Sequence, residues 1–375
     1  MKLGRIILFL SYFACVIFAF ICWTVPFGYI NSLGEYVYTA ANYNEQINRF
    51  VSSRYNANTK QVELWWMGAV KLGAVDAVVD KYVWLGGETL GFEYISDGVL
   101  VIAKSSVGVD NIEAGDVIKS VDGKAITSIH SLAEEINSTK DGEIMLKVRR
   151  DGNELTTKVK PKYDMYSQNY KLGVWAKDSM NGLGTLTYIT QDGNFGALGH
   201  PIVEPNTNVV MEVLDGGVYP CVIFGVEKAS RGYAGELKGT FTRGQSVGKI
   251  AKNCEYGVFG KIDSALLKGK TMIKVGGKMT IHPGKATILS SIDGKNVKEY
   301  EIEIIKTNYQ SAKTPKNFVF RVIDKELISK TGGIVQGMSG SPIVQDGLLV
   351  GAVTHVFVND ATKGFGTYID NMLNE

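Results

Sequence analysis

Short apolar segments separated by glycine turns fill most of this chain, and they limit the folds that it can adopt. The sequence contains 43 glycines and 8 prolines among 375 residues. Turn signals such as Asp192-Gly193, Asp215-Gly216-Gly217 and Asp293-Gly294 alternate with short apolar runs in the C-terminal half. Such spacing is typical of all-β domains. We therefore predict a mostly β protein in which residues 170–375 form a double β-barrel.

The overall charge and the histidine spacing exclude several classes of function. The formal net charge is +2, which predicts no strong attraction to nucleic acid or to a charged membrane surface. The histidines lack ligand spacing such as H-E-x-x-H, so we expect no metal and no cofactor. They are His130, His200, His282 and His355. Cys221 and Cys254 could pair outside the cytoplasm, although two free thiols are the favoured interpretation.

The N-terminus carries the pattern of a membrane segment. Lys2 and Arg5 precede residues 6–34, which contain no charged side chain. The apolar part is close to the length that spans a bilayer, and the basic lead favours a cytoplasmic N-terminus. We predict an uncleaved anchor at residues 1–30, with a cleaved signal peptide as the alternative. Either one places the rest outside the cytoplasm, beginning with a small β-rich connector at residues 31–80.

Residues 81–160 contain an ordered series of motifs. A glycine loop with Leu90-Gly91-Phe92 comes first, Ala114-Gly115-Asp116-Val117-Ile118 follows, and the hairpin turn at Asp122-Gly123 comes next. Ser131 and Glu134 then form a capping box that opens a short helix. This order resembles a PDZ domain. The resemblance implies a groove that adds a peptide strand to a sheet edge and holds a terminal carboxylate on the N–H groups of Leu90, Gly91 and Phe92. A small β-domain without a ligand is the alternative.

The stretch from Gly337 to Pro342, Gly-Met-Ser-Gly-Ser-Pro, has the composition of a catalytic turn. Gly337 and Gly340 permit backbone angles that other residues avoid. Such a turn can expose the Ser339 hydroxyl and direct the N–H groups of Gly337 and Ser339 into one oxyanion hole. The stretch resembles the G-D-S-G-G-P loop of chymotrypsin-like serine proteases, with Met338 in place of the acid. Ser341 is the alternative nucleophile, and a hairpin turn without chemistry is the alternative for the whole stretch.

A serine nucleophile needs a base within hydrogen-bond reach, usually a histidine. His200 is the best candidate, because it follows an apolar strand in the bend Gly199-His200-Pro201. His355 lies in a strand that would line the substrate cleft of a chymotrypsin-like barrel. It could touch substrate, although a structural role is favoured. His282 reads as a turn residue, and His130 belongs to the PDZ-like segment.

Several blocks of the C-terminal half resemble one family of proteases. The blocks Ala197–His200, Lys330–Ile343 and Gly351–Val356, behind a PDZ-like module, resemble the SpoIVB peptidases, the stage IV sporulation serine proteases of endospore-forming bacteria. The resemblance assigns the nucleophile to Ser339 and the base to His200.

The same resemblance assigns the orienting acid to Asp324. That residue also begins Asp-Lys-Glu-Leu-Ile-Ser-Lys-Thr-Gly-Gly, which reads as an N-cap, a short helix and a glycine stop. Both interpretations of Asp324 stay open at this point.

The resemblance also implies a biological role. Such a protease cleaves itself near its N-terminus and acts across the inner forespore membrane on a membrane-bound regulator of an intramembrane metalloprotease that processes a sigma factor. It implies a protein substrate, self-cleavage and a membrane attachment, with no nucleic acid. The alternatives are a non-catalytic PDZ adaptor with a pseudo-protease barrel, and an HtrA-like envelope quality-control protease. In proteases of the HtrA type, however, the PDZ domains follow the protease.

Overall fold

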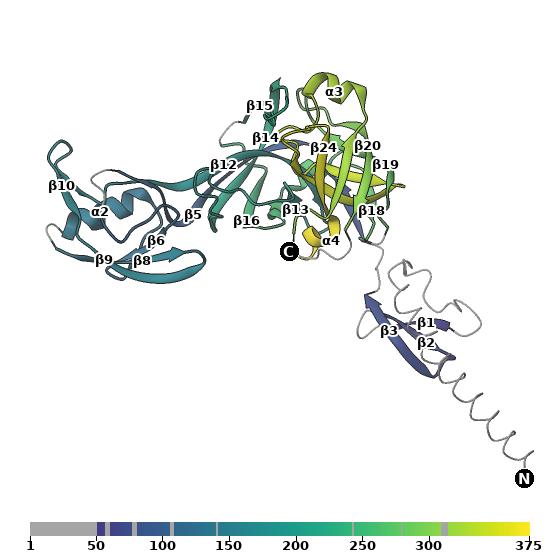
Figure 1. Cartoon of the computed structure of the whole chain (residues 1–375), viewed down its shortest axis with the longest axis horizontal. Coiled ribbons are helices and arrows are strands. Elements are labelled where there is room, and N and C mark those ends of the chain that lie inside the picture. The colour runs from purple at the N-terminus through teal and green to yellow at the C-terminus, as the bar shows by residue number, and fades with distance from the viewer. Residues whose placement is uncertain are drawn as a thin grey trace, which may run out of the picture. The chain divides into compact units, whose positions relative to one another are not determined.

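The computed structural model of the chain (Figure 1) describes residues 51–56, 61–76, 81–105, 109–139, 142–241, 244–278, 280–308 and 314–375. The anchor predicted at residues 1–30 lies outside the described residues. Among the residues that the structure describes, no helix combines the length and apolar character needed to cross a bilayer. Strands dominate the described chain, which confirms the prediction of a mostly β protein. The chain divides into two compact units. The larger one consists of Tyr82–Ile273 and His282–Glu375, and the smaller one consists of all other residues.

The smaller unit contains part of the predicted connector. An antiparallel sheet of three strands is formed by β1 (Val51–Asn56), β2 (Gln61–Trp66) and β3 (Val70–Asp76), in the order β1-β2-β3. Met67 and Gly68 join β2 to β3 with positive φ angles of 48° and 70°, as a tight hairpin turn requires. The β-rich character predicted for the connector holds for these strands.

Two long strands run through the larger unit and belong to both of its parts (Figure 1). They are β5 (Thr89–Lys104) and β12 (Val174–Ile189), each 16 residues long. They pair antiparallel from Val174 opposite Lys104 to Thr185 opposite Thr89. One end of this ribbon therefore lies in a small PDZ-like module and the other end in a β-barrel.

The PDZ-like module is built around the far end of the ribbon. Its remaining elements are β6 (Val117–Val121), β7 (Lys124–Ala125), α2 (Ile129–Thr139), β8 (Ile144–Arg150), β9 (Asn153–Val159), β10 (Lys162–Asp164) and β11 (Asn169–Lys171). Its apolar core extends from Val99 to Leu172, with Val174 and Ala176 packed against it. Residues on both sides of position 160, the predicted end of the module, contribute to this core.

The first barrel surrounds the near end of the ribbon. It adds β13 (Asn194–Ala197), β14 (Val213–Glu227), β15 (Glu236–Phe241), β16 (Gly248–Cys254) and β17 (Gly257–Ile262). The pairings β12-β13-β17-β16-β14-β5-β12 close a ring. Its core includes Leu90, Phe92, Leu186 and Val258.

A second ring closes in the C-terminal half. Its strands pair in the order β19-β20-β21-β24-β23-β22-β19. Two closed rings agree with the predicted double barrel. The predicted bounds of 170–375 do not contain it, because β5 completes the first ring from residues before 170. The remaining bounds are β4 (Tyr82–Leu85), η2 (Ser264–Leu267), β18 (Met272–Val275), β19 (Gly284–Ser290), β20 (Lys298–Thr307), β21 (Phe318–Val322), α3 (Lys325–Thr331), β22 (Pro342–Gln345), β23 (Leu348–Val356), β24 (Lys363–Tyr368) and α4 (Ile369–Leu373).

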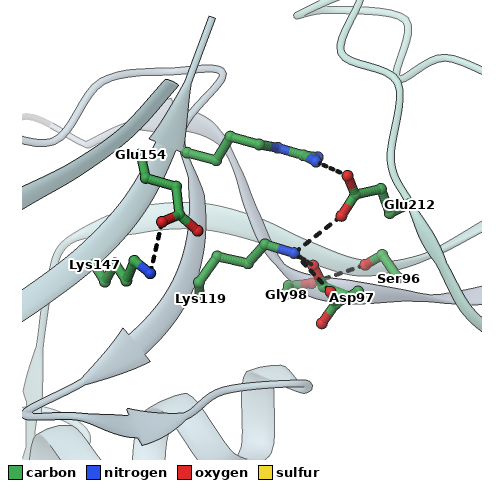
Figure 2. Close-up of polar contacts among 8 residues, drawn as sticks. Ser96, Asp97, Gly98, Lys119, Lys147, Glu154 and Glu212 are labelled. Carbon is green, nitrogen blue, oxygen red and sulfur yellow. Dashed lines mark hydrogen bonds and ion pairs between the residues drawn. The ribbon is translucent and has the colours of Figure 1, made fainter. Parts of the chain in front are cut away.

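Ion pairs join the PDZ-like module to the first barrel, as Figure 2 shows. The Lys119 amine on β6 lies 2.8 Å from Asp97 Oδ2 and 3.2 Å from Glu212 Oε2. Arg149 on β8 pairs with the other oxygen of Glu212, which directly precedes β14. We call Asp97, Lys119, Arg149 and Glu212 the junction cluster. The two carboxylates are about half exposed, so solvent screens the cluster and each pair contributes little free energy.

Candidate active site

The stretch from Gly337 to Pro342 forms a tight loop between α3 and β22. Gly337 and Gly340 have φ angles of 96° and 92°, in the region that favours glycine. A Cβ on Gly340 would lie 2.0 Å from the Thr185 carbonyl oxygen and 2.4 Å from the Leu198 amide nitrogen. Glycine at position 340 is therefore required both by its backbone angles and by the close approach of two other segments.

Strand β12 holds this loop in place. The Thr185 N–H donates to the Ser339 carbonyl at 2.8 Å, and the Thr185 hydroxyl donates to the Gly337 carbonyl at 2.9 Å. The Thr187 hydroxyl donates to the Gly340 carbonyl at 2.7 Å. Both threonines are fully buried. Neither threonine was among the predicted site residues, because a threonine in an apolar strand gives no local sign of a partner about 150 residues away.

Some backbone amides of the loop donate a hydrogen bond within the protein, and others do not. Met338 donates to the Val335 carbonyl, Gly340 to Val353 and Ser341 to Met338. The Gly337 and Ser339 amides, in contrast, donate to no acceptor within the described part of the chain. These are the two amides predicted to form the oxyanion hole, and they are the ones left available for a ligand oxygen.

Ser339 and Ser341 have different surroundings. The Ser339 side chain is half-buried, and its hydroxyl donates to the Thr354 carbonyl at 3.0 Å. Ser341 is completely buried, and its hydroxyl has no hydrogen-bond partner among the described residues. A buried hydroxyl cannot meet a substrate carbonyl, so the geometry favours Ser339 over Ser341 as the nucleophile.

His200 leaves the first barrel on a strained bend. Leu198 and Gly199 both have positive φ angles, 66° and 69°, and a Cβ on Gly199 would lie 2.9 Å from Thr354 Cγ2. His200 Nδ1 lies 2.8 Å from the Pro201 carbonyl oxygen. Because a carbonyl only accepts, this hydrogen bond places the proton on Nδ1 and leaves Nε2 as the basic nitrogen. Burial lowers the pKa of His200 and so favours the neutral ring.

Asn253 on β16 fixes the chain that follows His200. Its Oδ1 accepts the Ile202 N–H at 2.9 Å, while its Nδ2 donates to the Ile202 carbonyl and to the Tyr94 hydroxyl, each at 2.9 Å. Asn253 is buried, and burial raises the pKa of Tyr94 to about 12. This support for the base was also missed, since a single asparagine next to a cysteine carries no recognisable motif.

Asp324 acts as a helix cap in this structure. Its Oδ1 accepts the Leu327 N–H at 2.8 Å, and its Oδ2 accepts the Glu301 N–H at 3.4 Å. Gly332, with a φ of 78°, ends the helix and donates to the Ile328 carbonyl. The hydrogen bonds of the described residues include none between Asp324 and His200. The cap interpretation is confirmed. The orienting role stays a prediction, because no hydrogen bond joins Asp324 to His200 among the described residues.

A second histidine lies beside the base. The ring centroids of His355 and His200 are 5.1 Å apart, with 42° between the ring planes. Burial, the charge of His200 and the charge of Lys316, in that order, lower the pKa of His355 to about 4. The other two histidines are exposed and pair with carboxylates, His282 with Asp346 and His130 with Glu134.

The structure corrects the predicted carboxylate-binding loop. Leu90, Gly91 and Phe92 lie inside β5, where they pair with β12 on one side and with β14 on the other. Leu90 and Phe92 are buried in the first barrel. A Cβ on Gly91 would lie 2.3 Å from the Phe241 ring. The prediction was wrong because a glycine between two apolar residues also fits a strand packed under an aromatic ring.

An open strand edge lies elsewhere in the module. Between Val174 and Thr185, β12 pairs with β5 and with no other described strand. Helix α2 begins beside this edge, where the Ile129 N–H donates to Asp178 Oδ2 at 2.8 Å. A free strand edge near a helix is the arrangement that accepts an added peptide strand in PDZ domains.

Solved structures resemble parts of the chain. The PDZ domain of the SdrC-like protein Lmo2051 from Listeria monocytogenes is 23% identical over 22% of this chain and 90% of its own, with a TM-score of 0.21. The active form of the Rv3671c protease from M. tuberculosis is 11% identical over 53% of this chain and 73% of its own, with a TM-score of 0.30. The HtrA-type protease AlgW with a decapeptide is 12% identical over 76% of this chain and 61% of its own, with a TM-score of 0.31.

Two family models match the chain. A PDZ domain model matches residues 89–160, so it includes the part of β5 that lies in the first barrel. None of the curated proteins matches the chain. The model of SpoIVB peptidase S55 matches residues 168–373, which is more than half of the sequence and includes His200, Asp324 and Ser339. The chain therefore belongs to the SpoIVB peptidase S55 family.

Proposed function

We propose that the chain is a serine endopeptidase in which Ser339 is the nucleophile and His200 the general base. The Ser339 oxygen attacks the scissile carbonyl carbon while His200 Nε2 takes the hydroxyl proton. The amides of Gly337 and Ser339 hold the oxyanion. His200 then gives its proton to the leaving amine, and water releases the acyl group from Ser339. The observation that carries this proposal is the pair of unoccupied amides beside a half-buried serine hydroxyl.

The proposed reaction requires one local rearrangement. The Ser339 hydroxyl donates to the Thr354 carbonyl and must turn toward His200 Nε2 before it can attack. We expect rotation about the Cα–Cβ bond of Ser339 to supply this change, because the backbone of the loop is bonded to Thr185. Family membership supports a serine protease, and in this proposal the observed orientation of Ser339 is the resting state.

We further propose that this protease signals during sporulation. In this proposal residues 1–30 anchor it in the inner forespore membrane facing the intermembrane space. It cleaves itself, with release from the membrane as one outcome, and then a membrane-bound regulator of an intramembrane metalloprotease. The SpoIVB family match supports this role, and the PDZ match supports a module that binds a protein segment. The open edge of β12 is the surface that we expect that segment to use.

Self-cleavage tests the proposed activity directly. The full-length chain in detergent micelles, wild type beside Ser339→Ala, is followed by intact mass over hours. We expect the wild type to lose N-terminal peptide and Ser339→Ala to stay whole, because removal of a serine nucleophile costs on the order of 10⁶-fold in rate. Ser341→Ala is the matched control and keeps the wild-type rate. Cleavage of Ser339→Ala at the parent rate would contradict the proposal.

The resting orientation of Ser339 also fits the alternative of a non-catalytic adaptor. An adaptor with a pseudo-protease barrel predicts that wild type and Ser339→Ala both remain whole, alone and with any added target protein. An envelope quality-control protease predicts broad digestion of unfolded casein, whereas a signalling protease leaves casein largely intact. The same preparations distinguish these outcomes.

A further inference from the structure

The base of the proposed reaction has an unusual set of neighbours. Among the described residues, no carboxylate forms a hydrogen bond or an ion pair with His200 or with His355. His200 Nδ1 bonds to the Pro201 carbonyl, and the charged group that acts on the pair from outside is Lys316. When His200 takes the serine proton, its positive charge therefore develops in a half-buried site that already has a cation nearby. The Pro201 carbonyl stabilises part of that charge through Nδ1, and a further polar neighbour would add to this stabilisation.

His355 is placed to do so. Its ring lies 5.1 Å from that of His200, and its Nδ1 is buried with no hydrogen-bond partner in the described part of the chain. A buried nitrogen without a partner costs free energy in the resting protein. A catalytic role is one of the explanations for such an atom.

The backbone of His355 is fixed by the same strand that holds the nucleophile at rest. His355 lies on β23 opposite Phe365 of β24, within the closed second barrel. Thr354, the preceding residue, accepts the Ser339 hydroxyl. Adjacent residues of one rigid strand therefore contact the nucleophile and the base.

We propose that His355 is a positioning residue of the protease, which packs against the His200 ring and stabilises the protonated base through its ring nitrogen. This inference rests on the proposed function. The groups that face His355 are the His200 ring, the Lys316 amine and the uncharged Phe365 ring of β24. Because His355 is neutral above about pH 4, its nitrogen is available as an acceptor throughout the neutral range.

The test measures how fast a fluorophosphonate labels Ser339 in the full-length chain, as a function of pH. In the labelling step the serine oxygen bonds to phosphorus, fluoride leaves, and the hydroxyl proton passes to His200. His355→Phe keeps a ring against His200 but removes both nitrogens. We expect labelling to slow by about tenfold, the effect of losing one hydrogen bond to a charged group. We also expect the acid limb of the pH profile to move to lower pH, since protonated His200 has lost a stabilising neighbour.

Two further variants make the result specific. His355→Ala removes ring and nitrogens together and should slow labelling by about 100-fold, within the range of a general base that is no longer positioned. His355→Gln restores a polar group and should move the acid limb back toward the wild type. His282→Phe, at an exposed histidine outside the site, should match the wild type.

The possible failures are distinguishable. If His355→Phe is labelled at the wild-type rate with an unshifted acid limb, His355 only fills space and the inference is overturned. If the wild type itself is not labelled at any pH, the proposed serine protease function fails, and the role of His355 fails with it.

Discussion

The loop from Gly337 to Pro342 and the junction cluster both contact the ribbon of β5 and β12, but different interactions hold them. The loop is fixed by the buried threonines Thr185 and Thr187, which bond to three of its carbonyls. The junction cluster is held by ion pairs, in which the Asp97 and Glu212 side chains are 47% and 58% exposed. The strength of buried neutral hydrogen bonds depends little on the salt concentration, whereas salt screens exposed ion pairs.

This difference in the kind of interaction distinguishes two regions of the larger unit, the loop and the junction. The loop that carries the proposed nucleophile is held by buried hydrogen bonds, which respond little to the solvent. The contacts between the PDZ-like module and the barrel are weaker individually, although the ribbon itself is continuous through both. We therefore expect changes at the loop to abolish activity and changes at the junction to modulate it.

Among the changes that test this comparison, a methyl group at Gly340 should have the largest effect on stability and on labelling. Gly340→Ala places a carbon 2.0 Å from the Thr185 carbonyl at a φ of 92°. We expect a loss of about 3 kcal/mol in the free energy of unfolding, from strain and overpacking together. Fluorophosphonate labelling should also disappear. Urea denaturation measures the first quantity.

Gly347→Ala is the matched control for that change. Gly347 has a φ of 75°, but no atom lies within 4 Å of the position that its Cβ would occupy, so backbone strain alone should cost about 1 kcal/mol. Equal losses for the two variants would show that the close contact with Thr185 is unimportant.

Removing one hydroxyl should have an intermediate effect. Thr185→Val keeps the shape of the side chain and leaves the buried Gly337 carbonyl without its donor. The free energy of unfolding should fall by about 1–3 kcal/mol, and labelling should slow because the Gly337 amide is no longer fixed. Thr156→Val, on an exposed position of β9, should change stability by less than about 0.5 kcal/mol. If Thr185→Val were as active and as stable as the parent, the hydrogen bond from Thr185 on β12 would not be what fixes the loop.

Neutralising the junction should have the smallest effect. Glu212→Gln weakens the pairs with Lys119 and Arg149, and we expect a loss below about 1 kcal/mol at low salt. At 1 M salt the difference from the parent should vanish. Glu154→Gln is the control, because its pair with Lys147 lies within the PDZ-like module (Figure 2). If Glu212→Gln slowed labelling more than Thr185→Val does, the junction would control the loop and the comparison would be wrong.

The parts of the site that local sequence can specify were predictable. Glycines at 337 and 340 around a serine indicate a special turn, and Gly199 beside His200 indicates a projecting bend. The alternation of apolar runs and glycine turns was sufficient to predict two barrels but not their bounds, because β5 completes the first ring from residues before 170. Each of these signals depends on residues within a few positions of one another.

The parts that depend on distant partners were not predictable. Thr185 and Asn253 reach their partners through strand pairings that no short pattern encodes. His355 was expected near the cleft, but its contact with the His200 ring was not predicted. The prediction for Leu90-Gly91-Phe92 failed for the same reason. These residues pair with a second neighbouring strand, β14, and so form part of the barrel rather than a loop. Asp324 could be recognised as a cap because its partner, Leu327, is only three residues away.

The most direct test of the central claim is to locate a fluorophosphonate adduct on the full-length protein by peptide mapping. Wild type and His200→Gln are treated in parallel at pH 7.5. The account predicts one adduct, on Ser339, that forms in the wild type and is almost absent in His200→Gln. An adduct on another serine, or an adduct on Ser339 that forms equally fast without His200, would contradict it.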